Sequence, residues 1–423
     1  MCQCANMSIS SFMRSQLAHL HIKKLLIMNL TDTPNANRLH ITLFGRRNCG
    51  KSSLINALTG QDTALVSNTP GTTTDLVSKA MEIQGIGPCL FIDTPGFDDE
   101  GELGELRISR TLKAIEKTDI ALLLCGDTTF SHEKEMLALL KEKNIPVIPI
   151  LNKIDIRENS DSLATYIENE CKIRPLLISV KEKTGIEQIR QAILEKLPSD
   201  FGQQNITGEL VTENDLVLLV MPQDIQAPKG RLILPQVQTI RELLDKKCLV
   251  VTCTTDKFSA TLQALARPPK LIVTDSQVFK TIYEQKPKES ELTSFSVLFA
   301  GYKGDIHYYV ESATAIEGLT ESSRVLIAEA CTHAPLSEDI GRVKLPRLLR
   351  KRIGENLQID MVAGTDFPQD LTPYSLVIHC GACMFNRKYV LSRIERAREQ
   401  HIPMTNYGVA IAFLNGILDQ IKY

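Results

Sequence analysis

The sequence predicts an α/β protein in which an N-terminal P-loop domain is followed by two smaller α/β domains with mostly parallel sheets. Three observations support this fold class. The 423 residues are too many for one ordinary core, so two or three domains are expected. Short apolar runs alternate with amphipathic stretches along the chain, a pattern typical of parallel strands covered by helices on both faces. A glycine-rich loop at residues 45–52 follows the first of these runs.

The first block, residues 36–199, is expected to form the P-loop domain. Its predicted strands are short apolar runs, each followed by a stretch with helical periodicity. These runs lie at residues 41–44, 89–92, 120–125, 147–151 and 175–178. The polar segment 198–207 that follows predicts a linker.

Two further α/β blocks follow the linker. The second block, residues 208–292, is predicted to contain strands at residues 216–221, 248–252 and 271–274, and another strand is predicted just beyond it at 297–300. The third block, residues 294–423, is predicted to contain strands at residues 325–329, 357–362 and 375–378. Helical segments separate the strands in both blocks, so parallel sheets are again expected.

Composition restricts the class of partner. The chain is 43% hydrophobic and 23% charged, the balance of a globular protein, and its formal net charge is −2. So small a charge supplies no general attraction for nucleic acid or anionic membranes, and no run of about eighteen apolar residues predicts a membrane span. Residues 1–35 carry no secretory signal and are predicted to form a disordered extension. We therefore expect a cytoplasmic protein with reduced cysteines.

A phosphate-binding loop is predicted at residues 45–52, which read Gly-Arg-Arg-Asn-Cys-Gly-Lys-Ser. Gly45 and Gly50 allow the backbone to curl, so that several N–H groups, those of Cys49 and Ser53 among them, point at one phosphate chain. The N-terminus of the following helix adds its dipole. The loop therefore predicts a bound nucleotide.

Three side chains are expected to act on the phosphates and on magnesium. Lys51 supplies a positive charge to the β- and γ-phosphates, and Ser52 supplies a hydroxyl to Mg²⁺. Asp93 follows a predicted strand, from which its carboxylate reaches Mg²⁺ through water. The sequence therefore predicts a magnesium–nucleotide complex.

Two neighbouring segments complete the predicted catalytic set. In residues 71–75, which read Gly-Thr-Thr-Thr-Asp, Thr73 is expected to bind Mg²⁺ when the nucleotide orders its loop, with Thr72 as the alternative. In residues 93–96, which read Asp-Thr-Pro-Gly, the backbone N–H of Gly96 is expected to reach the γ-phosphate. The predicted catalytic residues are Lys51, Thr73, Asp93 and Gly96.

The base is predicted to be guanine. Residues 152–155 read Asn-Lys-Ile-Asp, and the Asp155 carboxylate can accept both N1–H and N2–H₂ of guanine, whereas adenine would leave it unpaired. Asn152 braces the loop, and the stem of Lys153 packs over the ring. A backbone N–H of the next segment is expected to meet the guanine O6; this segment comprises Ser179, Val180 and Lys181. These residues predict hydrolysis of GTP to GDP and phosphate, and not an ATPase.

A second candidate site lies in the third block. Its two segments are Cys331-Thr-His333 and His379-Cys380-Gly-Ala-Cys383. Each follows a predicted strand, and the loops at the carboxyl ends of parallel strands converge, so the two segments are expected to meet. Gly381 is expected to permit a tight turn between the two later cysteines. Three thiolates with nearby imidazoles are typical of a structural zinc site or of a [4Fe–4S] cluster with one exchangeable position, and the residues alone leave both open.

The nucleotide motifs resemble those of the translation-factor-related GTPases, in particular the group that contains TrmE and Era. In that group a P-loop asparagine helps to bind K⁺, and Asn48 stands at the matching position. Phe97 stands where Ras-like proteins place a glutamine. The resemblance therefore implies that K⁺ and an ordered loop assist hydrolysis.

The whole chain from about residue 28 resembles HydF, the family of [FeFe]-hydrogenase maturation GTPases. This resemblance rests on the P-loop together with the Cys-x-His and His-Cys-x-x-Cys segments. It implies a [4Fe–4S] cluster held by Cys331, Cys380 and Cys383, with His333 or His379 near a labile fourth position. It also implies a homodimer formed through the second block.

The same resemblance implies a scaffold and carrier. Such a protein receives a diiron precursor from radical-SAM maturases and delivers it to the apo-[FeFe]-hydrogenase. The alternative function is an RNA- or ribosome-associated GTPase with a structural zinc site, although the near-neutral charge and the absence of an RNA-binding motif argue against nucleic acid.

Overall fold

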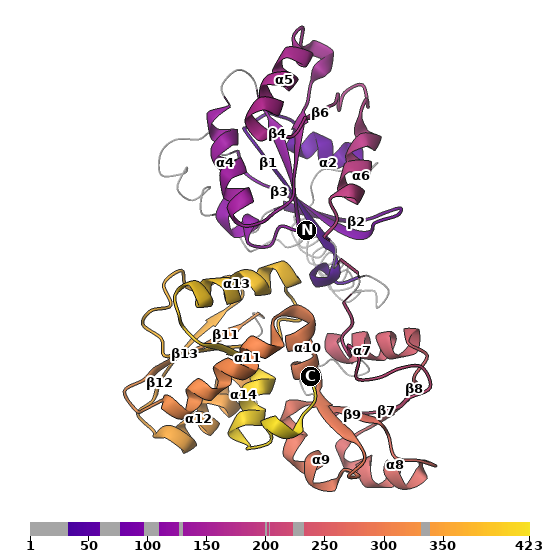
Figure 1. Ribbon diagram of the computed structural model, residues 1–423, viewed down its shortest axis with the longest axis vertical. Helices are drawn as coiled ribbons and strands as arrows, with labels where there is room; N and C mark the ends of the chain where they lie inside the picture. The colour runs from indigo at the N-terminus through magenta and orange to yellow at the C-terminus, as the bar shows by residue number, and fades with distance from the viewer. Residues whose placement is uncertain are drawn as a thin grey trace, which may run out of the picture.

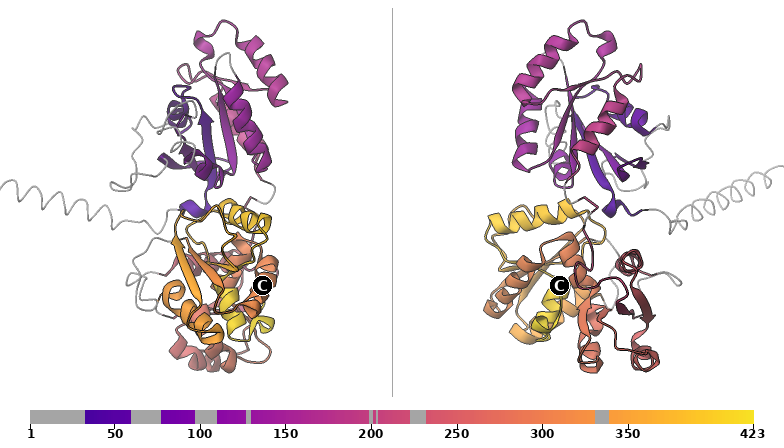
Figure 2. Two further views of the ribbon diagram at one scale, coloured as in Figure 1. Left: turned by 90° about the vertical axis from the view of Figure 1, so that its left-hand side faces the viewer. Right: turned by 45° about the vertical axis from the view of Figure 1, so that its right-hand side comes forward.

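The computed structural model describes residues 33–59, 77–96, 110–126, 130–198, 201–202, 204–222, 232–330 and 339–423. They form three α/β units, each built around its own sheet (Figure 1). The first unit occupies one end of the molecule, and the second and third units lie side by side at the other end (Figure 1, Figure 2). The expected fold class is confirmed.

The first unit contains a six-stranded sheet in the order β2-β3-β1-β4-β5-β6. Its strands are β1 (Leu39–Gly45), β2 (Val77–Ile83), β3 (Gly87–Asp93), β4 (Ile120–Cys125), β5 (Val147–Leu151) and β6 (Leu176–Leu177). All neighbouring strands are parallel except β2 and β3. The five strands expected from apolar runs are confirmed. The sequence does not predict β2, because its side chains alternate between exposed and half-buried positions and form no apolar run.

Helices cover both faces of this sheet. They are α2 (Lys51–Thr59), α4 (Ser131–Glu142), α5 (Ser160–Cys171) and α6 (Ile186–Glu195), with short turns η1 (Asn35–Asn37) and η2 (Ile154–Ile156). One buried cluster lies beneath α2 and α6 and includes Leu54 and Ile189, and the other lies beneath α4 and α5 and includes Leu140 and Ile167. Such a sheet leaves its functional loops at the carboxyl ends of the strands.

The second unit contains a four-stranded parallel sheet in the order β10-β9-β7-β8. Its elements are β7 (Leu216–Val220), α7 (Leu234–Asp245), β8 (Leu249–Cys253), η3 (Thr255–Lys257), α8 (Phe258–Ala264), β9 (Leu271–Thr274), η4 (Ser276–Val278), α9 (Phe279–Gln285) and β10 (Glu291–Ser294). The strands predicted at 216–221, 248–252 and 271–274 are therefore confirmed as β7, β8 and β9.

The strand predicted at residues 297–300 is wrong. These residues lie in helix α10 (Phe295–Lys303), which begins where the Ser294 hydroxyl accepts a hydrogen bond from the Val297 N–H at 3.2 Å. Val297 and Ala300 pack into a core shared with the third unit, while other residues of the helix pack into the second unit. A helix that is buried on both sides is apolar all round, so its sequence resembles that of a buried strand.

The third unit contains a four-stranded parallel sheet in the order β12-β11-β13-β14. Its elements are α11 (Ile306–Ala313), η5 (Thr314–Gly318), β11 (Arg324–Glu329), η6 (Ile340–Lys344), α12 (Leu345–Ile353), β12 (Gln358–Ala363), β13 (Leu376–His379), α13 (Arg387–Glu399), β14 (Met404–Asn406), α14 (Tyr407–Leu414) and η7 (Leu418–Gln420). The three strands predicted here are confirmed as β11, β12 and β13. The sequence misses β14 because three residues are too short for a recognisable apolar run.

Helix α13 of the third unit faces the first unit (Figure 1). Asn386, whose side chain caps α13, donates from Nδ2 to the carbonyl oxygen of Lys117 at 3.0 Å. Lys388 donates from Nζ to the carbonyl oxygen of Lys143 at 3.0 Å. The helix that follows the second cysteine segment is therefore in direct contact with the first unit.

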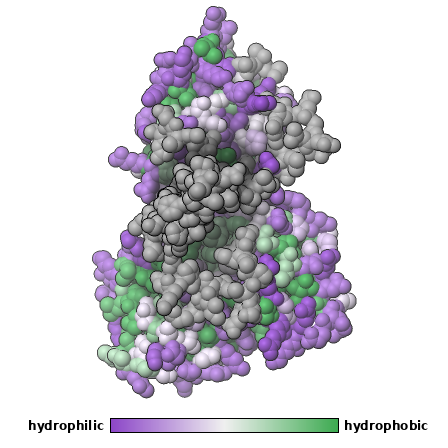
Figure 3. Space-filling model, turned by 180° about the vertical axis from the view of Figure 1, so that it is seen from behind, coloured by the Kyte–Doolittle hydropathy of each residue, from purple (hydrophilic) through white to green (hydrophobic). Residues whose placement is uncertain are grey.

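The two ends of the molecule differ in surface character. Hydrophilic residues predominate over the first unit, whereas apolar residues are more prominent over the other two (Figure 3). On the second unit, Leu244 of α7 and Leu249 of the edge strand β8 are 57% and 52% exposed. Among the described residues, no helix combines the length and the apolar character that a membrane span requires.

Candidate functional site

The phosphate loop joins β1 to α2 and contains three residues with a positive φ, namely Gly45, Asn48 and Gly50. Gly50 has a φ of +97°, and a Cβ at this position would lie 2.4 Å from Asn152 Nδ2. Asn48 has a φ of +60°, a conformation that asparagine accepts more readily than most residues. The curl of the loop therefore needs a residue without a side chain at position 50.

Lys51 lies inside this loop. Its side chain is buried, and Nζ donates to the carbonyl oxygens of Gly45 and Arg46, both at 2.8 Å. The Cys49 sulfur lies 3.9 Å from the same ammonium, and burial raises the pKa of this thiol. The loop thus holds one positive charge at its centre, where the phosphates of a nucleotide would lie.

Ser52 and Asp93 are in direct contact, although 41 residues separate them in the sequence. The Ser52 hydroxyl donates to Asp93 Oδ2 at 2.5 Å. Burial raises the pKa of the Asp93 carboxyl, while the Ser52 hydrogen bond and the charge of Lys51 act to lower it. The other carboxylate oxygen, Oδ1, is buried and has no hydrogen-bond partner among the described residues. A hydroxyl beside a carboxylate oxygen without a partner is a donor set that fits Mg²⁺.

Asn152 connects three loops at the carboxyl edge of the sheet. Its Nδ2 donates to the Cys49 carbonyl oxygen at 3.1 Å. Its Oδ1 accepts from the N–H of Lys153 at 2.8 Å and from that of Val180 at 3.2 Å. This side chain therefore fixes the phosphate loop relative to both segments that are predicted to read the base.

Asp155 projects from the same edge and is exposed. Its Oδ1 accepts a hydrogen bond from the Ser179 hydroxyl at 2.7 Å, and this bond lowers the pKa of the Asp155 carboxyl. The Ser179 and Val180 N–H groups already donate to Thr184 and Asn152. The carboxylate is therefore held ionised and oriented by its neighbour.

Some predicted residues are not placed by the structure. Thr72, Thr73 and Phe97 lie outside the described residues, as do Cys331 and His333. Gly96 is described and half-buried, three residues beyond the carboxylate that ends β3. Ser53 lies exposed in the first turn of α2.

Sequence reasoning misses an ion pair between the phosphate loop and a buried carboxylate of helix α4. Arg46 Nε lies 2.9 Å from Oε1 of Glu133, a carboxylate with 0% exposure. Glu133 also accepts the N–H of Gly126 at 3.1 Å. Nothing in the sequence distinguishes Glu133 from the other acidic residues of α4, because its burial depends on how the helix packs against β4.

The second cysteine segment begins at the end of β13. The Cys380 sulfur accepts hydrogen bonds from the N–H groups of Ala330 at 3.0 Å and Ala382 at 3.4 Å. Burial raises the pKa of Cys380 to about 11, while these two N–H groups act to lower it. Ala330 immediately precedes Cys331, so the chain that leads into the first cysteine segment lies against this sulfur.

The turn between the two cysteines differs from the expectation. The left-handed residue is Ala382, with a φ of +52°, and not Gly381. Gly381 has ordinary backbone angles, and a Cβ there would meet no atom within 4 Å. The turn therefore does not require glycine, because the chain reverses one residue later.

His379 is buried, and both of its ring nitrogens have partners. Nδ1 lies 2.8 Å from the Cys380 carbonyl oxygen, and Nε2 lies 2.8 Å from Nη1 of Arg393. A carbonyl only accepts and a guanidinium only donates, so Nδ1–H donates and Nε2 accepts. Burial, with a contribution from Arg393, lowers the pKa of His379 to about 3. In this arrangement neither nitrogen is free to bind a metal, which does not favour His379 as a fourth cluster ligand.

Two buried cations flank the cysteine segment. Arg393 is 1% exposed and Lys303 is 2% exposed. Lys303 Nζ donates to the carbonyl oxygens of Phe385 at 2.6 Å and Ala36 at 3.2 Å, and burial lowers its pKa to about 8 while Cys383 acts to raise it. Within the described residues, neither cation forms an ion pair with a carboxylate. Buried unpaired charges are costly, so this environment fits an anionic group held by the cysteines.

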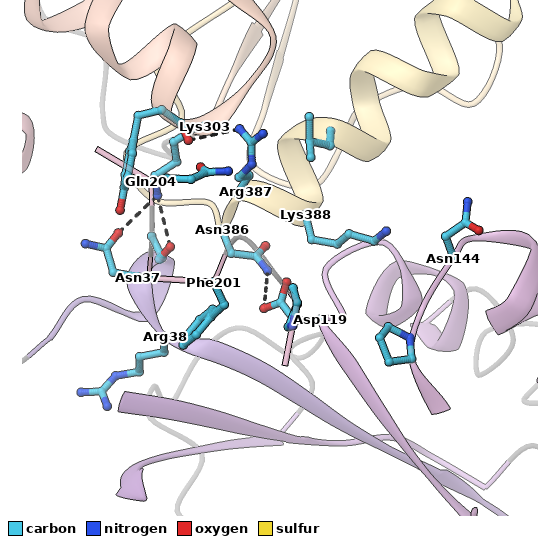
Figure 4. Close-up of a pocket in the computed structure, with 16 residues that line it drawn as sticks. Asn37, Arg38, Asp119, Asn144, Phe201, Gln204, Lys303, Asn386, Arg387 and Lys388 are labelled. Carbon is cyan, nitrogen blue, oxygen red and sulfur yellow. Dashed lines mark hydrogen bonds between the residues drawn. The ribbon is translucent and has the colours of Figure 1, made fainter. Parts of the chain in front are cut away.

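Lys303 lies at the junction of all three units, beside a cavity of about 450 Å³ (Figure 4). Asn37 and Arg38 of the first unit line this cavity together with Asn386 and Arg387 of the third. The structure therefore connects the start of β1 with the cysteine segment through one buried ammonium.

The described residues contain no preassembled group of three or more His, Cys, Asp or Glu side chains that could hold a metal ion. Two of the five cysteine and histidine candidates, Cys331 and His333, lie outside the described residues. The donor set that the described residues supply consists of Cys380 and Cys383.

Three stretches of the chain match known protein families. Residues 40–153 match the family described as 50S ribosome-binding GTPase. Residues 206–304 match the hydrogen maturase F dimerization domain, and residues 307–422 match the hydrogen maturase F tetramerization domain. The last two matches together span about half of the chain.

Curated relatives are similar over part of their length. The tRNA modification GTPase MnmE of Nitrosomonas eutropha is 35% identical over 199 residues, which cover 46% of this chain and 42% of that protein. The protein of the same name from Dechloromonas aromatica is 37% identical over 159 residues, which cover 37% of this chain and 34% of that protein. The chain thus spans less than half the length of these relatives.

Solved structures are similar at a more distant level. The G domain of the T. maritima FeoB iron transporter is 23% identical, covers 38% of this chain and 98% of its own, and has a TM-score of 0.31. Aquifex aeolicus Era bound to GDP and AlF₄⁻ is 19% identical, covers 51% of this chain and 92% of its own, and has a TM-score of 0.33. The first unit is a P-loop GTPase domain by its family match and its own topology.

Proposed function

The chain belongs to the hydrogen maturase F family, and we propose that it is a GTPase that binds a [4Fe–4S] cluster and acts as scaffold and carrier in [FeFe]-hydrogenase maturation. The single observation that carries the cluster proposal is the environment of the second cysteine segment. Two backbone N–H groups donate to the Cys380 sulfur, and two buried cations lie beside the segment without a carboxylate partner among the described residues.

For the nucleotide, the proposed roles follow from the contacts of each residue. Ser52 would bind Mg²⁺ directly and Asp93 through water, with Thr73 completing the set. Asp155 would accept both guanine donors, since Ser179 occupies only one of its oxygens. The N–H of Lys181 would meet the guanine O6, because the N–H groups of Ser179 and Val180 are already engaged.

Potassium is proposed at Asn48, whose positive φ turns the phosphate loop. A cation beside the β- and γ-phosphates would stabilise the charge that develops during hydrolysis. We expect a higher rate of GTP hydrolysis in KCl than in NaCl at equal ionic strength. Equal rates in the two salts would remove this role.

The cluster would be held by Cys331, Cys380 and Cys383. When bound, it would supply an iron with one exchangeable coordination position, to which a diiron precursor could be attached. The chain's own contribution is to fix the loop: Cys380 receives two N–H donors, and the Asn406 amide donates to its carbonyl oxygen at 3.4 Å. Of the two candidate histidines, His333 is the one we propose as the neighbour of the labile position.

The dimerization and tetramerization domains support self-association. We propose a homodimer formed through the second unit, where apolar side chains are exposed on α7 and on the edge strand β8. An unpaired edge with exposed apolar residues is a surface that proteins usually cover. The proposed partners outside the dimer are the radical-SAM maturases and the apo-hydrogenase.

The test is anaerobic purification and reconstitution of the full chain with iron and sulfide, followed by metal analysis and EPR. We expect about four irons per chain and a reducible [4Fe–4S] signal. The variant Cys380→Ala should lose both, whereas Cys248→Ala, a buried cysteine of the second unit, should retain them. Zinc in place of iron would instead support the RNA- or ribosome-associated GTPase with a structural zinc site.

A further inference from the structure

Helix α13 carries an arginine that points into the protein. Arg393 is 1% exposed, and all of its hydrogen bonds go to neutral groups. It donates to Nε2 of His379 at 2.8 Å, to the carbonyl oxygen of Gly364 at 2.6 Å and to the hydroxyl of Tyr389 at 3.3 Å. Its Nε is buried and has no hydrogen-bond partner among the described residues.

Three aromatic rings surround the same guanidinium. The Arg393 Cζ lies 4.7 Å from the ring centre of Phe367, 4.6 Å from that of Phe385 and 4.7 Å from that of Tyr389. Such contacts stabilise a cation that has left water, but they do not neutralise it. The guanidinium thus keeps its full charge inside the core.

Arg393 contacts the cysteine segment at both ends. His379 immediately precedes Cys380, and Phe385 lies two residues beyond Cys383. The guanidinium is hydrogen-bonded to His379 before the cysteines and packs against the Phe385 ring after them. The position of Arg393 therefore restrains the loop between these two residues. The bond to His379 also occupies the nitrogen that could otherwise turn towards a metal.

A buried arginine cannot escape its cost by losing a proton, since a guanidinium stays protonated in proteins. An apolar side chain of similar volume would cost less to bury in this aromatic pocket. The positive charge of Arg393 is therefore best explained by an interaction with a negative charge nearby. Its guanidinium is hydrogen-bonded to His379, the residue next to Cys380, which places the positive charge beside the cysteine segment.

We propose that Arg393 is a positioning residue of the cluster site, which holds residues 379–385 in place and fixes a positive charge beside the cluster. This inference rests on the proposed function, because it requires a [4Fe–4S] cluster on this loop. Reduction adds one negative charge to the cluster, so a nearby fixed cation favours the reduced form and raises the reduction potential. His379 is then a support of the loop, oriented by Arg393.

The first test measures the midpoint potential of the reconstituted full chain by an EPR-monitored titration. Arg393→Met removes the charge at similar length, and we expect it to shift the reduction equilibrium at least tenfold towards the oxidised cluster, which is about 59 mV for one electron. Arg393→Lys keeps the charge and should lie closer to wild type. The matched control is Arg398→Met, which removes an arginine from the same helix that is 47% exposed and paired with Asp305. Equal potentials for Arg393→Met and Arg398→Met would overturn the proposed charge effect.

The second test records NMR spectra of metal-free protein labelled with ¹⁵N-histidine. It can therefore also be applied to a variant that binds no iron. We expect wild type to show a His379 ring with a protonated Nδ1 and an unprotonated Nε2, assigned by the loss of its signals in His379→Gln. Arg393→Met should shift these signals, and Arg398→Met should not. Unchanged His379 signals in Arg393→Met would overturn the positioning role. Wild-type protein without iron would instead contradict the proposed function, while this measurement still decides whether Arg393 orients His379.

Discussion

In the nucleotide site residues of different sequence motifs contact one another, whereas the described cysteine segment, residues 379–383, is also held by charged residues of two helices. Ser52 meets Asp93, and Asn152 meets the Cys49 carbonyl, so three motifs brace each other directly. Around the cysteines the contacts come instead from Arg393 on α13 and Lys303 on α10. A site whose motifs contact one another can be recognised from the sequence, because the motifs contain both the binding residues and their supports. In a site that is supported by other elements, the sequence reveals the candidate ligands but not the residues that hold them.

The two sites also differ in how charge is balanced. In the nucleotide site burial raises the pKa of the Asp93 carboxyl, while the Ser52 hydrogen bond and the Lys51 ammonium act against this rise, so a cation and a carboxyl group share the site. Beside the cysteines the two buried cations have neutral partners only, among the residues that the structure describes. The first site therefore carries its own countercharge, and the second would obtain one from the anionic cluster that we propose it binds.

The largest expected effect separates the two sites. Lys51→Ala removes the charge at the centre of the phosphate loop, and GTP hydrolysis should fall by about 10²–10³-fold, the usual cost of one donor to developing charge. Iron content after reconstitution should not change, because among the described residues the hydrogen bonds of Lys51 stay within its own loop. Phosphate release and iron analysis on the same preparation measure both.

The control for this variant is Lys134→Ala, which removes a lysine that is 66% exposed and paired with Glu170. It should leave hydrolysis and iron content at wild-type levels. Loss of iron in Lys51→Ala but not in Lys134→Ala would show that iron binding depends on the nucleotide site.

The second prediction concerns acid stability of the first unit. Burial lowers the pKa of His40 from 6.5 to about 4, and Nε2 lies 2.9 Å from the Asn35 carbonyl oxygen. Between these two values the unfolded chain binds a proton that the folded chain does not, so stability falls as pH drops from 6.5 to 4. The loss amounts to about 3 kcal/mol and is absent above pH 6.5.

His40→Gln keeps a donor for Asn35 and does not titrate, so its stability should decline less over this interval. Calorimetric scans of nucleotide-free protein at several pH values measure the difference in Tm. His132→Gln changes an exposed histidine of α4 and serves as the control. Parallel pH profiles for wild type and His40→Gln would contradict the assignment of this acid sensitivity to His40.

The smallest effects come from a pair of glycines. Gly50→Ala places a Cβ 2.4 Å from Asn152 Nδ2 at a φ of +97°, and such strain of about 1–3 kcal/mol should weaken GTP binding by roughly 5- to 150-fold. Gly381→Ala meets no atom within 4 Å and should leave iron content unchanged. Nucleotide titration and iron analysis test the pair. A loss of iron in Gly381→Ala would mean that the cysteine turn depends on glycine after all.

Most strands are predictable because a buried parallel strand is a continuous apolar run. The elements that escape prediction lack this signal or share it with another structure. The edge strand β2 has an exposed face and no run, and β14 has only three residues. Helix α10 has such a run but is a helix, because it lies between two cores and needs apolar residues on every side.

By itself the sequence determined the phosphate loop and the guanine motif, since each is a short segment whose spacing dictates its chemistry, and it located the cysteine pair while leaving zinc and a [4Fe–4S] cluster open. Only the tertiary structure decided which buried charged residues support those segments. Arg393, Lys303 and Glu133 are charged residues of ordinary helices, and their burial follows from packing between elements far apart in the chain. His379 shows the same dependence: in the sequence it is a candidate ligand, and in the fold both its nitrogens are committed to Arg393 and to the backbone.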